Sequence, residues 1–279
     1  MTIKQIDESL EEGLSLKTIA QAYSEIANLK IKKIRADAER NRIFFGEIGS
    51  VYSLVKDLAV RQKITIKKPK KTVSLVLTSN YRFYGSINSD LLDYYTQAIQ
   101  KLATDHIYLG KAAIDYFRAR PPSANHKEVL LKDDAPDAGE LNSLAVELSA
   151  YNQVFVFHSR MKSLLVQQPT VIDITASADA SHLEGEKMQK FKFIFEPELP
   201  KILEFFDSQI ITLLLEGAFL ESELSRTASR FISMDQAETE ANKFIKEYQI
   251  LKAYTKRNMD NNTILENFAT MAAVRKEKA

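Results

Sequence analysis

The stretch AETEANKFIKEYQIL, residues 237–251, carries apolar side chains at steps of three and four positions. That spacing puts them on one face of an α-helix and leaves the polar residues between them on the other. The apolar positions are Ala237, Ala241, Phe244, Tyr248 and Leu251. The same rhythm occurs upstream at Ile202, Phe206, Ile210, Leu213 and Gly217. The pattern predicts one long C-terminal helix, over 198–279, with a seam like that of a coiled coil.

Residues 1–68 show the same periodicity and contain no proline. All seven prolines lie between Pro69 and Pro200, and proline interrupts helices because it lacks a backbone donor and clashes with the preceding turn. We therefore predict a second long helix at the N-terminus, with Gly13, Gly46 and Gly49 as its weak points. Its expected seam is formed by Ile3, Ile6, Leu10, Leu16, Ile19, Tyr23, Ile26, Ile48, Val51, Val55 and Leu58.

The length of these helices decides the architecture. A helix over residues 1–68 would extend roughly 100 Å, whereas a compact domain of the whole chain would be only about 50 Å across. Two such helices cannot fit inside one globule. We expect them to run antiparallel with their apolar seams together, and the middle of the chain to fold as a separate head. The expected divisions are 1–68, 69–197 and 198–279.

The middle of the chain alternates short β-rich runs with stretches of helical spacing. The expected strands are 72–77, 106–109 and 153–157, and the expected helices are 88–104, 111–119 and 138–151. Such alternation predicts a Rossmann-like βαβ sheet with helices packed on it. Two further candidate strands are 171–174 and 191–195. The stretch 120–137, with Pro121, Pro122, Asp133, Asp134 and Pro136, is expected to be an exposed loop. The fold class is thus α/β, a βαβ head with a long antiparallel coiled coil.

Composition excludes several classes of function. With 38 Lys and Arg against 37 Asp and Glu, the net charge of +1 gives no broad field for binding nucleic acid. The absence of cysteine removes disulfides, thiol nucleophiles and iron–sulfur clusters. The acidic N-terminus does not resemble a signal peptide, and no window has the apolar length of a membrane span. We expect a cytoplasmic chain that does not insert into a membrane.

A search for catalytic motifs finds none. The pair Gly110-Lys111 lacks the upstream glycine and the hydroxyl residue of a phosphate-binding P-loop, and only Gly85 follows the first expected strand, where a dinucleotide fingerprint needs three glycines. The histidines do not have the spacing of metal ligands; they are His106, His126, His158 and His182. We expect no catalytic residue, no metal and no cofactor.

Several motifs resemble the γ subunit of F-type ATP synthases, the central rotating shaft. The C-terminal match begins at Phe195-Glu196-Pro197, which is similar to the family's YEP. The stretch from Leu220 to Ala237, LESELSRTASRFISMDQA, is similar to ESLASEHAARM followed by AMDNA. Residues 78–88, TSNYRFYGSIN, resemble TSDRGLCGGLN, with agreement at Thr78, Ser79, Gly85 and Asn88.

Two shorter motifs complete the resemblance. Residues 17–30 are similar to KITKAMEMVA followed by a lysine, with Tyr23 where the family has methionine, and Gln168-Pro169-Thr170 resembles QVPT. All matches occur in the family's order, so the resemblance covers essentially the whole chain. It departs at Asn80, Tyr81 and Arg82, which replace Asp-Arg-Gly, and near the C-terminus, where the family's ARQ and ITQE stretches are not retained.

The resemblance implies a non-catalytic rotor subunit whose helices insert into a hexamer of α and β subunits. The head would lie near an ε-like subunit and the membrane c-ring, so the chain would be peripheral to a membrane as part of a complex. The implied hexamer contacts lie at the two ends of the coil, and are Ile19, Gln21, Tyr23, Ile26, Lys30, Lys256, Arg257, Asn261, Asn262 and Glu266. The head motif of Thr78, Ser79, Gly85 and Asn88 faces a partner or serves local packing.

Three alternatives remain open. One is a γ-like shaft of a specialised F-like ATPase that is not devoted to proton-coupled ATP synthesis. The second is an elongated coiled-coil adaptor without a motor, which would not recover a nucleotide-binding hexamer. The third is a small-molecule enzyme built on the βαβ head, which would show turnover by the isolated chain.

Overall fold

The computed structural model describes residues 2–61, 71–100, 104–120, 125–175, 196 and 198–277. It confirms the two long terminal helices, α1 (Ile3–Arg61, 59 residues) and α6 (Leu199–Glu277, 79 residues). Neither Gly13, Gly46 nor Gly49 ends α1. The chain divides into two compact units, one of residues 1–26 and 231–279 and the other of residues 27–230. Each is described separately below.

The second unit contains a five-stranded sheet with the strand order β3-β2-β1-β4-β5. The strands are β1 (Thr72–Leu77), β2 (Asp105–Leu109), β3 (His126–Val129), β4 (Gln153–Met161) and β5 (Gln167–Asp173). The first four are parallel, and β5 is antiparallel to β4. The predicted βαβ alternation is therefore confirmed. The candidate strand 191–195 lies outside the described residues.

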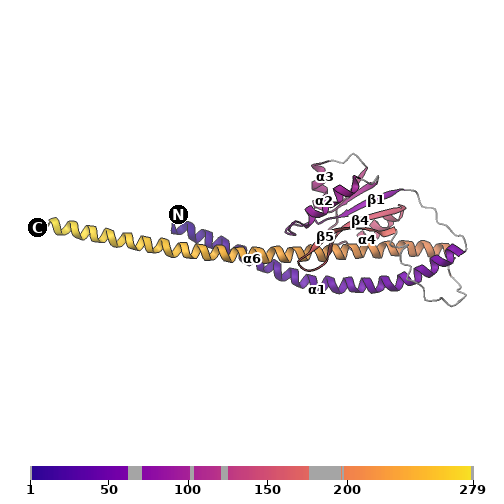
Figure 1. The fold of residues 1–279 in the computed structure, drawn as a ribbon, viewed down its shortest axis with the longest axis horizontal. Helices are drawn as coiled ribbons and strands as arrows, with labels where there is room; N and C mark the ends of the chain where they lie inside the picture. The colour runs from indigo at the N-terminus through magenta and orange to yellow at the C-terminus, as the bar shows by residue number, and fades with distance from the viewer. Residues whose placement is uncertain are drawn as a thin grey trace. The chain divides into compact units, whose positions relative to one another are not determined.

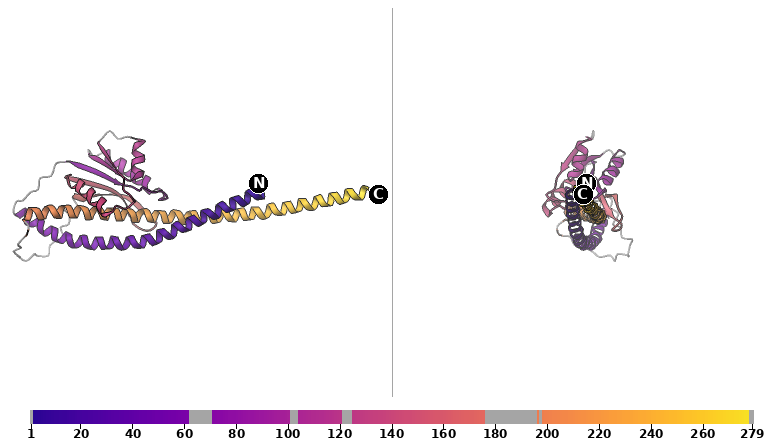
Figure 2. Two further views of the ribbon diagram at one scale, coloured as in Figure 1. Left: turned by 180° about the vertical axis from the view of Figure 1, so that it is seen from behind. Right: turned by 90° about the vertical axis from the view of Figure 1, so that its left-hand side faces the viewer.

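Helices cover both faces of this sheet (Figure 1). One face carries α2 (Ile87–Ile99) and α3 (Lys111–Arg118), with a core of aliphatic and aromatic side chains around Tyr95, Tyr108 and Phe157. The other face carries α4 (Ala138–Ser149) and the 211–219 stretch of α6. Figure 2 shows the same layers from behind. Burial of one stripe of α6 on the sheet makes part of the long helix a component of the head.

The stretch 120–137 differs from the exposed loop that its prolines and aspartates predict. It contains β3, a parallel strand at the edge of the sheet. Residues His126 to Val129 of β3 pair with His106 to Leu109 of β2. The strand is short and mostly exposed, so it lacks the apolar alternation by which strands are recognised. Asp134, expected in solvent, is only 3% exposed. Its burial depends on partners distant in sequence, which a local pattern does not reveal.

In the first unit, α1 and α6 pair antiparallel. Asp7 forms an ion pair with Lys252 at 2.5 Å, and Gln21 Nε2 donates to Glu238 Oε1 at 2.7 Å. Between these contacts, a Cβ added to Gly13 would lie 3.0 Å from Phe244 Cδ1. The helices therefore approach closely where a residue without a side chain faces a large aromatic one.

The buried positions of α1 match the predicted seam only in part, because Ile6 and Val55 are buried as predicted. The other buried positions lie outside the predicted seam and are Gly13, Ala20, Ala27, Ile31, Ile34 and Tyr52. Leu16, Ile19 and Ile26 are instead exposed by 63%, 53% and 55%. The prediction was wrong at these positions because it followed the largest apolar side chains, whereas close helix pairing selects small residues. On α6, Ala241 and Ile245 are buried, but Ala237 and Leu251 are exposed.

In the second unit, the same two helices remain antiparallel. Lys30 forms an ion pair with Glu223 at 2.7 Å, and Asn41 Nδ2 donates to Glu216 Oε2 at 3.1 Å. Two apolar clusters follow, one of Tyr52 with Ile210 and one of Val55 with Leu199 and Leu203. In Figures 1 and 2 this part of α1 runs along α6.

Candidate functional site

The carboxyl end of β1 lies at the crevice where doubly wound sheets usually bind ligands. Here residues 78–80 occupy it. Asn80 Oδ1 accepts from the backbone N–H of Lys111, the backbone oxygen of Ser79 accepts from Ala112, and Thr78 Oγ1 accepts from Ala113, each at 3.0 Å. These are the first three N–H groups of α3, the groups that would otherwise bind an anion.

Gly110, which precedes α3, allows this close fit. Its φ of +93° lies in the left-handed region, and an added Cβ would be 2.5 Å from the backbone oxygen of Thr78. A side chain is therefore excluded both by backbone conformation and by space. The glycine serves the contact between β1 and the start of α3.

Asp134 connects two loops at this edge of the sheet. Its Oδ1 accepts from the backbone N–H of Asn80 at 2.5 Å, and its Oδ2 accepts from the hydroxyl of Tyr84. Asn80 Nδ2 in turn donates to the backbone oxygen of Leu131 at 2.9 Å. Burial, and then the hydrogen bond to Asp134, raise the pKa of Tyr84, so the hydroxyl stays protonated and remains a donor.

Helix α6 joins this network through two arginines. Arg226 is 2% exposed, and it donates to Ser222 Oγ at 3.0 Å and to the backbone oxygen of Asp134 at 3.1 Å. Burial lowers the pKa of its guanidinium, and the nearby Asp134 carboxylate opposes that shift. Arg230 lies over the ring of Tyr84, 4.0 Å from the centroid, and donates to the backbone oxygen of Arg82.

We call this set of residues the head–helix junction: Asn80, Tyr84, Asp134, Arg226, Ser229 and Arg230. Ser229 Oγ adds a hydrogen bond of 2.7 Å to the backbone oxygen of Tyr84. Removing one partner from a buried charged network costs about 3–5 kcal/mol. The junction therefore holds the loops of the sheet tightly on α6, and its chemistry is that of a mechanical connection.

The predicted head motif makes contacts within the second unit. Thr78 Oγ1 donates to the backbone oxygen of Leu109 at 2.8 Å, and Asn88 Nδ2 donates to Ser79 Oγ at 2.7 Å. Gly85 has a φ of +59°. These four positions fix the loop between β1 and α2, which supplies Tyr84 to the junction.

The predicted contact residues of α1 lie on different sides of the helix. Ile19 and Ile26 are exposed, and Tyr23 is half-buried. Gln21 and Lys30 have partners on α6, Glu238 and Glu223 respectively. The apolar side chains available to a partner are Leu14, Leu16, Ile19, Ile26 and Leu29, all more than half exposed.

The predicted contact residues of α6 are all exposed. Every residue from 256 to 271 is exposed, including Lys256, Arg257, Asn261, Asn262 and Glu266. Large apolar side chains share this segment, namely Met259, Ile264, Leu265, Phe268 and Met271. This segment of α6 mixes apolar and polar side chains and buries none of them, so its surface is one that another chain could cover.

Sequence reasoning missed Asp134 and Arg226. Asp134 lies in the stretch assigned to solvent, and Arg226 lies in a motif noted only for its resemblance. One signal was available: an arginine at the seventh position of LESELSRTASR stands among small residues, which are typical of a helix packed closely on its neighbour. Its partner could not be identified without the fold.

The part of the chain that the structure describes contains no group of acidic and histidine side chains able to hold a metal ion. Among the same residues, no helix has the length and apolar character needed to cross a bilayer.

Comparison with known proteins gives the family. The family model described as ATP synthase matches residues 2–266. The chain belongs to the ATP synthase family. Among curated relatives, the ATP synthase gamma chain of Pelotomaculum thermopropionicum is 25% identical over 251 residues, which cover 87% of this chain and 86% of the relative. That of Staphylococcus saprophyticus is 22% identical, covering 89% and 91%.

Solved structures of ATP synthases share the fold. The central stalk and c-ring structure of the Tetrahymena thermophila mitochondrial enzyme contains a chain with a TM-score of 0.60 and 21% identity, and the match covers 78% of this chain and 99% of that one. A chain of the Euglena gracilis mitochondrial F1 and c-ring structure has a TM-score of 0.57 and 14% identity, with 90% and 97% covered. Both confirm the α/β fold with long terminal helices.

Proposed function

We propose that this chain is the central-stalk rotor subunit of a rotary ATP synthase or ATPase, the role of a γ chain. The observation that carries this proposal is the family match over residues 2–266 in a chain whose ends form two long, antiparallel helices. A rotor needs a stiff shaft and a firm attachment between that shaft and the head. The paired helices supply the first, and the head–helix junction supplies the second.

The proposed hexamer contacts are the exposed residues at the ends of the coil. Ile19 and Ile26 present apolar surface on α1, and 256–271 presents a mixed surface on α6. An asymmetric rod would contact three otherwise equivalent catalytic sites differently. Because a partner shifts a conformational equilibrium only by the difference in its contacts with the two states, rotation would favour each site's conformations in turn.

The proposed partners of the head are an ε-like subunit and a membrane c-ring. The structures that share this fold include a central stalk with its c-ring and an F1 assembly with its c-ring. The head has exposed apolar side chains that suit a protein partner, among them Tyr81, Phe83, Leu130 and Leu165. We assign the chain to the face of a membrane as a peripheral part of the complex.

The chain itself is proposed to be non-catalytic, with no cofactor. Residues 78–80 satisfy the N–H groups of α3 at which a nucleotide phosphate would bind in this type of sheet. Purified chain is expected to hydrolyse no ATP. Turnover that copurifies with the chain through several columns, and that disappears on substitution of a head residue, would support an enzyme instead.

Purification of the native complex tests the rotor proposal. A tag on this chain should recover α and β subunits with one copy of the chain per three β subunits, measured by quantitative mass spectrometry. An adaptor would recover no nucleotide-binding hexamer, and a one-to-one ratio with any partner would contradict a rotor. If the chain is the rotor of a specialised ATPase, the purification should recover the same hexamer together with a different set of membrane subunits.

A further inference from the structure

A cavity of about 380 Å³ lies within the second unit, where α1 and α6 meet β4 and β5. None of the head–helix junction residues lines it. Cavities that hold small molecules have volumes of about 300–1,000 Å³, whereas packed interiors keep few voids larger than a water molecule. The volume of this cavity is therefore within the range of sites that hold small molecules.

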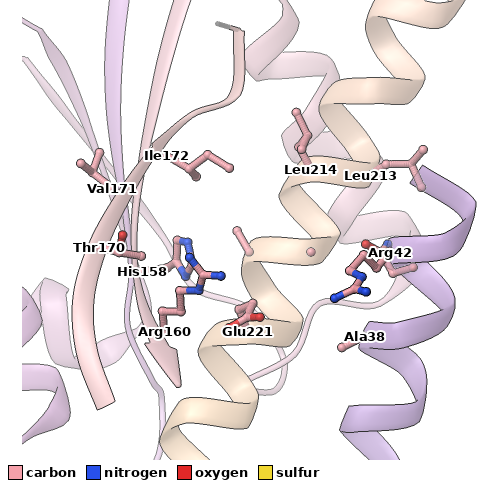
Figure 3. A pocket seen from close by; sticks show the side chains of 13 residues that line it. Ala38, Arg42, His158, Arg160, Thr170, Val171, Ile172, Leu213, Leu214 and Glu221 are labelled. Carbon is pink, nitrogen blue, oxygen red and sulfur yellow. The ribbon is translucent and has the colours of Figure 1, made fainter. Parts of the chain in front are cut away.

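The walls of the cavity are mainly apolar. Ile172 of β5 points toward α6, Leu214 contributes from α6, and Leu213 lies on the side of α6 next to α1, which contributes Ala38. Figure 3 shows His158 and Arg160 of β4 reaching toward Glu221 of α6. Arg42 lies on the α1 side of α6 in the same view.

Glu221 has an unsatisfied carboxylate oxygen. Its Oε2 is buried and has no hydrogen-bond partner in the described residues. A buried acceptor without a donor costs free energy, and a charged acceptor costs more than a neutral one. The oxygen is therefore placed to receive a hydrogen bond from something other than the described side chains.

The opposite wall offers a cation and a second acceptor. The side chain of Arg160 makes no hydrogen bond or ion pair within the ranges that the structure describes, and Arg160 is exposed at the edge of the cavity. His158 is 5% exposed, and its Nδ1 lies 3.2 Å from the backbone oxygen of Ser159. When Nδ1 donates to that oxygen, Nε2 is left as an acceptor.

We propose that this cavity binds a small zwitterion with an apolar body, of which an apolar α-amino acid is the simplest example. The ammonium group donates to Glu221 Oε2, the carboxylate pairs with Arg160, and the side chain packs on Leu213, Leu214 and Ile172. A simple anion would leave the Glu221 oxygen without a donor, and it would be repelled by the negative charge of the Glu221 carboxylate. A simple cation would face Arg160 and Arg42.

Calorimetric titration of the full chain with L-leucine and two analogues tests the assignment. N-acetyl-leucine lacks the ammonium group, and leucinamide lacks the carboxylate. Leucine is expected to bind saturably with a Kd below about 10 mM, and each analogue should bind at least about tenfold more weakly because it loses a charged hydrogen bond. No saturable binding of leucine overturns the proposal, and so does equal binding of N-acetyl-leucine.

Variants of the chain locate the site. Glu221→Gln and Arg160→Gln should each weaken leucine binding at least about tenfold, and Ala38→Leu should abolish it by filling the cavity. Lys162→Gln, at an exposed lysine outside the cavity, is the matched control and should bind as the unaltered chain does. Unchanged affinity in both polar variants overturns the proposed site. The analogue titrations use the unaltered chain, so they decide the outcome even where a variant fails to fold.

Discussion

The guanidinium of Arg226 donates to the backbone oxygen of Asp134 at 3.1 Å, although the two residues are 92 positions apart in the chain. This contact joins α6 to the loop after β3, and the Asp134 side chain extends the connection to Asn80 and Tyr84. One buried arginine thus fixes two loops of the sheet on the long helix.

Arg226→Ala should destabilise the chain by about 3–5 kcal/mol, because it leaves the Asp134 network buried without its cation. Urea unfolding monitored by circular dichroism measures the change. Arg42→Ala, at an exposed arginine, is the control and should alter stability by no more than about 0.5 kcal/mol. A loss below about 1 kcal/mol for Arg226→Ala would show that the junction contributes little.

Ile26 and Ala27 are neighbours with opposite exposure, 55% and 1%. Ile26→Asp should leave stability within about 0.5 kcal/mol of the unaltered chain while reducing recovery of α and β subunits from the native complex. Ala27→Asp should cost more than about 3 kcal/mol by burying an unpaired charge. Thermal unfolding and quantitative pull-down measure the two effects. Normal hexamer recovery with Ile26→Asp would argue against α1 as a contact surface.

Two glycines of α1 should respond oppositely to substitution. Gly46 has no atom within 4 Å of an added Cβ, so Gly46→Ala should stabilise the chain by about 0.5–1 kcal/mol through helix propensity. At Gly13 an added Cβ would be 3.0 Å from Phe244, so Gly13→Leu should destabilise by about 1–3 kcal/mol through overpacking. Chemical unfolding of both variants provides the measurement. Equal effects at the two glycines would contradict the close pairing at Gly13.

Stability should decrease in mild acid because of His158. Burial lowers the pKa of His158 to about 4, below the ordinary value of about 6.5. Between these values the unfolded chain binds a proton that the folded chain does not, so the free energy of unfolding falls as the pH falls through this window, by at most about 3 kcal/mol.

The variant His158→Gln should reduce this dependence. Urea unfolding at several pH values between about 4 and 7 compares its slope with that of the unaltered chain, and Lys162→Gln should keep the original slope. An unchanged slope in His158→Gln would place the acid sensitivity elsewhere.

The elements with strong local patterns could be predicted from the sequence. The long helices followed from proline placement, and β1, β2 and β4 followed from their buried β-branched and aromatic runs. β3 could not be found, because an exposed edge strand has no apolar signal. Part of the seam of α1 was misassigned because Gly13, Ala20 and Ala27 are small. Their burial depends on the shape of the opposing helix, which periodicity alone does not describe.

The candidate site was less accessible to sequence reasoning than the fold. Thr78 and Ser79 were identified through a resemblance. In the structure Thr78 forms a hydrogen bond with the start of α3, and Ser79 forms one within the loop that follows β1. Arg226 and Asp134 gained meaning only through tertiary contact. The outward side chains of Ile19 and Ile26 were chosen as partner contacts and also as seam residues, and their exposure excludes the second role.

The occupied amides at the start of α3 limit what protein engineering can do with this head. A phosphate placed there would have to displace three intramolecular acceptors, and any residue other than glycine at position 110 would collide with Thr78. Converting the scaffold into a nucleotide sensor would therefore require rebuilding residues 78–80 before adding any affinity. Grafting a new recognition loop at the opposite end of the strands would leave that arrangement undisturbed.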